Sequence, residues 1–286
     1  MDQIKFSYEM EILFGDFIHE HHFTLRCFPK KSVRQNILEM HTEVSPYDML
    51  CESWDGFGNT TFIGYKKDEH KRFSVSVDGI ATVDWSRYET DTNLNMCYKI
   101  QTPYTMPSHA MHDFFNQHFA RKMRELTEYA MAEYIMHTVH EHFTYCKQVT
   151  TVNTVAAAAF DLKKGVCQDY AHVMLTFARM ALLPARYVVG LMIGEGESHA
   201  WVEVFCKGRW YGFDPTNDAL IGNNYIIISK GRDCKDCIIN QGKFYGTGDQ
   251  KQTIKAKVEI IDGTDDCKGG ASGRGDAGNP KKQTDV

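Results

Sequence analysis

One cysteine stands where a thiol could be made reactive. Apolar residues follow Cys167 at helical spacing, at Ala171, Met174, Leu175, Ala178 and Leu182. The spacing predicts a helix that begins at Cys167, just after Gly165, and ends before Pro184. A cysteine in the first turn of a helix faces unpaired backbone N–H groups and the positive end of the helix dipole, which favour the nucleophilic thiolate. The same N–H groups could stabilise the oxyanion that forms when a thiolate attacks a carbonyl group.

A histidine and an aspartate later in the chain could serve this thiol as base and orienting group. Two predicted strands are joined by Lys207-Gly208, a pair typical of a tight hairpin turn. If these two residues form the turn, Trp201 lies opposite Asp214, and His199 lies diagonally from Asp214 on the same sheet face. The imidazole could then move the thiol proton while the carboxylate fixes its tautomer. The place of Cys167 beside this pair depends on how the helix packs on the sheet.

Each of these residues also has a purely structural interpretation. A cysteine on an amphipathic helix is most often a small core residue. A strand histidine can be a satisfied polar side chain, and an aspartate before proline is a common turn residue. The chain has 9 cysteines and 13 histidines, so chance alone would produce some Cys–His–Asp order. Spacing alone therefore leaves catalysis and structural packing both open.

The elements that must position the three candidates occupy distinct regions. Residues 1–84 show apolar and polar residues in near alternation, as over 4–12, which predicts an antiparallel β-domain. Residues 85–107 form a connection. Residues 108–262 combine a helical region with the core that carries the candidates. Residues 263–286 are dominated by Gly, Asp, Lys, Ser and Asn, so we expect a disordered tail.

Within residues 108–262 the patterns predict helices first and then strands. The apolar spacing after Pro107 fits one bent helix or two. Thr154 is a candidate N-cap for a helix that starts at Val155 and ends near Gly165. Strands are expected at 186–193, 199–205, 209–214, 225–228 and 254–260.

The bulk composition excludes several classes of protein. With 43% hydrophobic residues, the 286 residues can fill one large or two ordinary domains. A net charge of −5 and a pI near 6.2 argue against a nucleic-acid binder. No apolar run approaches the ~18 residues needed to span a bilayer, and the first residues lack the pattern of a signal peptide. We therefore expect a cytoplasmic protein with reduced thiols that binds neither nucleic acid nor membrane.

Other groups of cysteines and histidines could bind metal, but none has a complete ligand pattern. Cys234 and Cys237 form a single C-x-x-C, whereas a structural zinc site needs a second pair or nearby histidines. The histidines within 19–22 have no identifiable carboxylate partner, and those within 137–141 do not form the His-Glu-x-x-His pattern of zinc hydrolases. We expect an incidental pair of thiols and no metal site.

Segments around the candidates closely resemble the core of the transglutaminase-like superfamily, in particular its bacterial and archaeal branch described as cysteine proteases. These segments are 165–172, 184–188, 198–204 and 212–217. The resemblance extends to the N-terminal region, at Leu25-Arg26, Pro29, Gln35 and 55–59, and to 231–233. Cys234 departs from the pattern, which usually has an aromatic residue there. The resemblance implies an α+β fold: a papain-like core, with the nucleophile's helix packed on an antiparallel sheet, preceded by an N-terminal antiparallel β-domain.

The resemblance also implies roles for residues at matching positions. Cys167 would be the nucleophile, His199 the general base and acid, and Asp214 the residue that orients His199. Gln168 and Trp201 are their neighbours, and either could line the acyl site or simply pack.

The activity implied by the resemblance is attack of Cys167 on an amide carbonyl to form a thioester acyl-enzyme. Water as the second substrate makes a peptidase or amidase, and an amine makes a transglutaminase. We expect hydrolysis of a peptide or protein amide, because the matching branch is described that way. The alternative from a different class is a non-catalytic binding or scaffold protein, for which a damaged triad is expected. No cofactor is required, and no acidic loop has the spacing of a calcium site.

Overall fold

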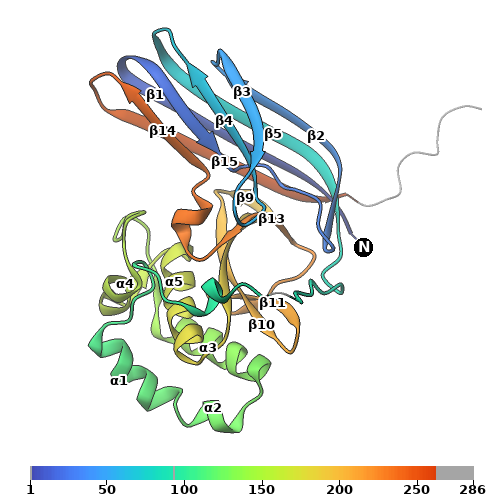
Figure 1. Ribbon diagram of the computed structural model, residues 1–286, viewed down its shortest axis with the longest axis vertical. Coiled ribbons are helices and arrows are strands. Elements are labelled where there is room, and N and C mark those ends of the chain that lie inside the picture. The colour runs from blue at the N-terminus through green and yellow to red at the C-terminus, as the bar shows by residue number, and fades with distance from the viewer. Residues whose placement is uncertain (1, 93, 262–286) are drawn as a thin grey trace, which may run out of the picture.

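Long antiparallel strands form one part of the molecule, and helices packed on a second sheet form the other (Figure 1). The computed structural model describes residues 2–92 and 94–261. The predicted α+β class, with an antiparallel N-terminal region and helices packed on an antiparallel core sheet, is confirmed. In this part of the chain no helix is both long and apolar enough to cross a membrane.

The N-terminal region is organised around one long strand, β1 (Asp2–Leu25). Every second side chain from Ile4 to Phe14 is buried, because successive side chains of a strand point to opposite faces. The first half of β1 pairs with β5 (His70–Val83), and its second half pairs with β4 (Thr60–Lys66). Two further strands complete this side: β2 (Gln35–Ser45) beside β5 and β3 (Met49–Trp54) beside β4.

The chain returns to this first sheet near its C-terminal end. Both β14 (Asn240–Tyr245) and β15 (Gln250–Ile261) pair antiparallel with β1, and the short strand β9 (Gly194–Gly196) pairs with β15. The predicted division, which assigned residues 108–262 to the core, differs here from the structure. An alternating pattern identifies a strand but does not specify its partner. The predicted tail, 263–286, lies outside the described residues.

The helical region contains three α-helices where one or two were predicted. They are α1 (His109–His118), α2 (Lys122–Glu125) and α3 (Glu128–His142), after a 3-10 helix, η1 (Met96–Lys99). The hydroxyls of Ser108 and Thr127 accept hydrogen bonds from first-turn N–H groups of α1 and α3. Each cap gives its helix a separate start, which divides the apolar run.

The predicted N-cap at Thr154 is wrong by one residue. Val155 precedes α4 (Ala156–Leu162), whereas Thr154 Oγ1 accepts a hydrogen bond from the backbone N–H of Thr151 (2.9 Å). A short parallel pair, β6 (Thr144–Tyr145) with β7 (Lys164–Gly165), then leads into α5 (Cys167–Met180). The predicted start of this helix at Cys167 is confirmed.

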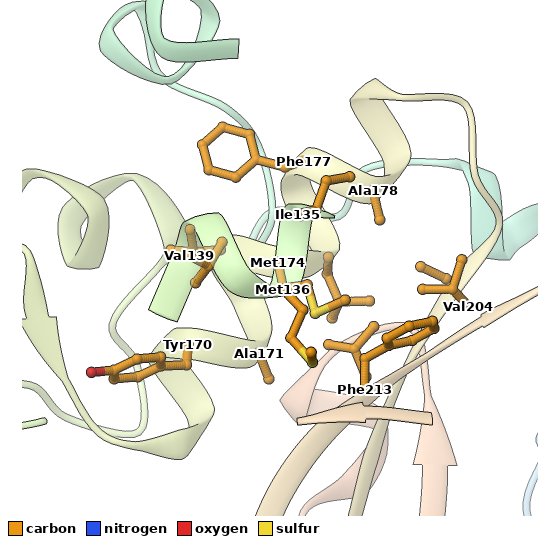
Figure 2. Close-up of a cluster of buried hydrophobic side chains, with 14 of the residues drawn as sticks. Ile135, Met136, Val139, Tyr170, Ala171, Met174, Phe177, Ala178, Val204 and Phe213 are labelled. Atoms are coloured by element: carbon orange, nitrogen blue, oxygen red, sulfur yellow. The ribbon is translucent and has the colours of Figure 1, made fainter. Parts of the chain in front are cut away.

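The core sheet has the strand order β12-β11-β10-β8-β13 with antiparallel neighbours. Its strands are β8 (Ala185–Met192), β10 (His199–Cys206), β11 (Arg209–Asp214), β12 (Ala219–Leu220) and β13 (Tyr225–Gly231), and a 3-10 helix, η2 (Cys234–Cys237), follows. Helices α3 and α5 cover one face, where Met136 and Met174 share a buried apolar cluster with Val204 and Phe213 (Figure 2).

The opposite face of the core sheet packs against the N-terminal region. Leu191 belongs to the same buried apolar cluster as the inward side chains of β1. A group of charges lies at this junction: Arg34 Nη1 is 2.6 Å from Glu203 Oε1. Arg186 Nη2 lies 2.6 Å from Glu203 Oε2 and 2.9 Å from Glu89 Oε2. Apolar packing and ion pairs therefore hold the two parts together.

Candidate active site

The turn before α5 fixes the position of Cys167. Asp169 Oδ2 accepts hydrogen bonds from the backbone N–H of Val166 (2.8 Å) and from Thr150 Oγ1 (2.7 Å). A Cβ atom on Gly165 would lie 2.4 Å from the same oxygen, so this position requires glycine. The carboxylate thereby holds the first turn of the helix in place, and Cys167 is left partly exposed at its end.

The hairpin brings His199 and Asp214 together as predicted. The register of β10 and β11 runs from Val202 opposite Phe213 to Cys206 opposite Arg209, which confirms the two-residue turn. His199 Nε2 lies 2.7 Å from Asp214 Oδ2. Hairpin geometry alone therefore places these two side chains in contact.

Asp214 is buried and receives hydrogen bonds on both carboxylate oxygens. Oδ1 accepts the backbone N–H groups of Thr216 (2.9 Å) and Asn217 (3.2 Å). Besides His199, Oδ2 accepts Asn217 Nδ2 (2.7 Å) and the hydroxyl of Tyr225 (2.8 Å). Burial by itself would raise the pKa of Asp214, but these donors and the neighbouring histidine hold it below its usual value.

The imidazole of His199 contacts both other candidates. Burial opposes its charged form, but the hydrogen bonds to Asp214 and Cys167, together with their negative charges, raise the pKa of His199 from 6.5 to about 10. Because Nε2 is directed at Asp214, the remaining ring nitrogen, Nδ1, is available to the thiol. The structure therefore brings Cys167, His199 and Asp214 into one line of contacts.

Cys167 and His199 line a cavity of about 420 Å³. Tyr145, Lys147 and Gln148 also line it, together with the segment 192–198, which includes β9. Both side chains are thus accessible from this cavity, which a purely structural cysteine and histidine would not require.

The two supporting residues occupy different places. Trp201 is fully buried, and its ring stacks near that of His199 with centroids 6.3 Å apart, so it packs behind the histidine. Gln168 donates to the backbone carbonyl of Val152 (3.3 Å) and lines a second, neighbouring cavity.

Tyr225 and Asn217 are site residues that the sequence interpretation missed. Asn217 lies three positions after Asp214, within the segment 212–217 that carries the family resemblance, so its position in the sequence could have indicated its contact with Asp214. Tyr225 comes from β13, which pairs with β8 and not with either strand of the hairpin. No local pattern could have indicated its contact with Asp214.

The other cysteine and histidine groups have partners of their own. Burial raises the pKa of Cys234 to about 12, so its thiol stays protonated at neutral pH. His21 Nδ1 is 3.2 Å from His70 Nε2, and burial lowers the pKa of His21 to about 4. His140 Nδ1 contacts the backbone carbonyl of Pro215 (3.2 Å). Over residues 2–92 and 94–261, no group of three or more His, Cys, Asp or Glu side chains could hold a metal ion.

Comparison with known families agrees with this architecture. Residues 117–215 match the transglutaminase-like superfamily core, and residues 4–82 match the bacterial transglutaminase-like N-terminal region. The chain therefore belongs to the transglutaminase-like superfamily and carries the N-terminal region of its bacterial members.

Relatives and solved structures extend the comparison. An uncharacterized protein of Mycobacterium tuberculosis is 26% identical over 268 residues, covering 82% of this chain and 84% of that protein. A protein-glutamine gamma-glutamyltransferase of Pseudomonas aeruginosa is 33% identical over 92 residues, 27% of this chain and 14% of that protein. The crystal structure of a "putative cysteine protease" from Cytophaga hutchinsonii superposes with a TM-score of 0.75 at 19% identity, covering 91% of each chain. That likeness shows a shared fold across nearly the whole molecule.

Proposed function

We propose that the chain is a cysteine hydrolase that cleaves a peptide or protein amide through Cys167, His199 and Asp214. The observation that carries the proposal is the contact of one imidazole with both the thiol and a fully buried carboxylate, at a cavity of about 420 Å³. A purely structural histidine does not need a pKa far above its ordinary value, nor an accessible thiol beside it.

In the proposed reaction the thiol proton resides on His199, and the resulting thiolate attacks the amide carbonyl carbon. The carbonyl oxygen becomes an oxyanion, which the first-turn N–H groups of α5 can stabilise. His199 then donates its proton to the leaving amine as the C–N bond breaks, which leaves a thioester on Cys167. Water, deprotonated by His199, attacks the thioester and releases the acid and the free thiol. Asp214 keeps the imidazole oriented throughout.

Selective alkylation tests the proposed nucleophile. Iodoacetamide at neutral pH should label Cys167 faster than the exposed Cys51, which serves as an internal comparison in the same molecule. His199→Ala should slow labelling of Cys167 by roughly 10²- to 10⁴-fold, the range for loss of a general base. The matched variant His109→Ala, at a histidine 94% exposed on α1, should leave the labelling rate as in the wild type. Equal rates at Cys167 and Cys51, insensitive to His199→Ala, would reject the proposal.

Transfer of the acyl group to an amine is the second candidate, favoured by the name of the Pseudomonas relative. It uses the same thioester and differs only in the acceptor. Incubation of a peptide library with and without a labelled amine separates the two. Release of free acid in both cases supports hydrolysis, whereas amine incorporation without free acid would replace it with transamidation.

A further inference from the structure

Two cavities flank the first turn of α5. The first, of about 420 Å³, contains Cys167 and His199. The second, of about 330 Å³, contains Gln168, the residue after the nucleophile. Ser198 lines both. The two cavities therefore adjoin at Ser198, one beside the thiol and the other beside the next residue of the helix.

A strand of the first sheet forms a wall of both cavities. Ala256 of β15 lines the first cavity, and Gln252 of the same strand lines the second. These residues are four positions apart, so they share a face of the strand and lie roughly 13 Å from each other at ~3.3 Å per residue. That length corresponds to about four residues of an extended chain.

The second cavity has an apolar wall. Val152, Val189, Ile238 and Ile239 line it, while the amide side chains of Gln168 and Asn240 lie among its polar groups. Val152 is 72% exposed, so its side chain is open to a ligand bound in this cavity. An apolar side chain next to a polar backbone fits this mixture of groups.

The first cavity offers an unpaired strand edge. Within the described chain β9 is the edge strand of its sheet and pairs only with β15. In this pairing Gly196 lies opposite Ala256. Gly194 and Gly196 line the cavity, and a Cβ atom on either would meet no protein atom within 4 Å. A bare, open edge of this kind can accept an extended peptide as an added strand.

We propose that the two cavities form one substrate groove for an extended peptide, with an apolar substrate side chain in the cavity lined by Val152 and Val189. The inference rests on the proposed function and deepens it: the attacked amide lies within a polypeptide, with residues bound on both sides of it. It also assigns a role to the first sheet, whose strand β15 completes the groove.

Kinetics with two substrates test the groove. One substrate is a set of fluorogenic peptides with leucine or aspartate scanned on both sides of the cleaved bond, and the other is the small ester p-nitrophenyl acetate. In Val152→Asp the ratio of kcat/KM for leucine peptides to that for the ester should fall by roughly 10- to 200-fold, the range for loss of apolar pocket contacts. Gly196→Val should lower the same ratio by blocking the β9 edge.

Matched controls lie away from the groove. Leu182→Asp changes a side chain of similar exposure, 74%, just past the end of α5 that is far from Cys167. Gly56→Val adds a side chain at a glycine that also has open space, in the turn between β3 and β4. Both should keep the wild-type ratio.

The outcomes separate the two proposals. A lower ratio in the groove variants only, with preference for leucine on one side of the cleaved bond, supports the groove. Ester hydrolysis with the same ratio in groove and control variants overturns the groove and leaves the proposed function standing. Hydrolysis of neither substrate by the wild-type protein overturns both.

Discussion

Replacing Asp214 by asparagine should remove the charge that keeps His199 protonated while preserving the shape of the side chain. In the folded protein the pKa of His199 is about 10, against 6.5 for an ordinary histidine. At 1.36 kcal/mol per pKa unit, this difference corresponds to roughly 5 kcal/mol of stabilisation of the charged form. The attraction of Asp214 and Cys167 must also offset the burial penalty, and Asp214 supplies more than half of it, so we assign Asp214 at least about 3 kcal/mol.

The sign of the pH dependence follows from the raised pKa. A group whose folded pKa lies above its unfolded value stabilises the fold fully below the unfolded pKa, here 6.5, and this stabilisation is lost as the pH rises through about 10. The free-energy cost of Asp214→Asn should therefore be larger at pH 7 than at roughly pH 10.5, by at least about 3 kcal/mol. The cost of disturbing the other hydrogen bonds to Asp214 should remain at both pH values.

Urea denaturation of the two proteins at both pH values measures this difference. Asp236→Asn is the matched control, because Asp236 pairs with Arg232 (2.8 Å), whose guanidinium keeps its charge over the whole range. Its cost should not change with pH. If Asp214→Asn costs the same at neutral and alkaline pH, His199 is not held protonated by Asp214, and the proposed proton transfer loses its basis.

Two further changes test the surroundings of the site. Tyr225→Phe removes one hydrogen-bond donor from Asp214 and should lower the free energy of unfolding by roughly 1.5–3 kcal/mol, as measured by denaturation. It should also lower kcat in steady-state kinetics. A wild-type kcat would mean that Tyr225 does not position Asp214 and His199. Glu203→Gln leaves Arg34 and Arg186 without their shared carboxylate and should lower the free energy of unfolding by about 3–5 kcal/mol. Glu125→Gln, in an exposed pair with Arg121, should cost far less, because solvent screens that pair. Equal costs at the two glutamates would contradict the importance of the buried charges.

Much of the core could be predicted because its signals are local. The apolar spacing after Cys167 sets the helix, and Lys207-Gly208 sets the register of the hairpin. Once the turn is fixed, strand geometry places His199 within reach of Asp214. The helical region after Pro107 was less predictable, because the caps at Ser108 and Thr127 divide a pattern that is otherwise compatible with one continuous helix.

Contacts between segments far apart in the chain could not be predicted from the sequence. Strand β15 alternates like any half-buried strand, and nothing in its residues says that it pairs with β1, over two hundred residues earlier. Likewise, Tyr225 reaches Asp214 only because β13 lies beside β8 in the folded sheet.

The amino-acid sequence by itself therefore determined the candidate nucleophile, its helix and the paired histidine and aspartate, since each depends on spacing within a few dozen residues. Only the tertiary structure decided that Cys167 meets His199, that five donors hold Asp214, and that β15 walls the cavities beside the thiol. These contacts form when apolar faces of separate segments pack against one another. The apolar pattern of one segment shows which face will be buried, but it does not identify the segment that will cover that face.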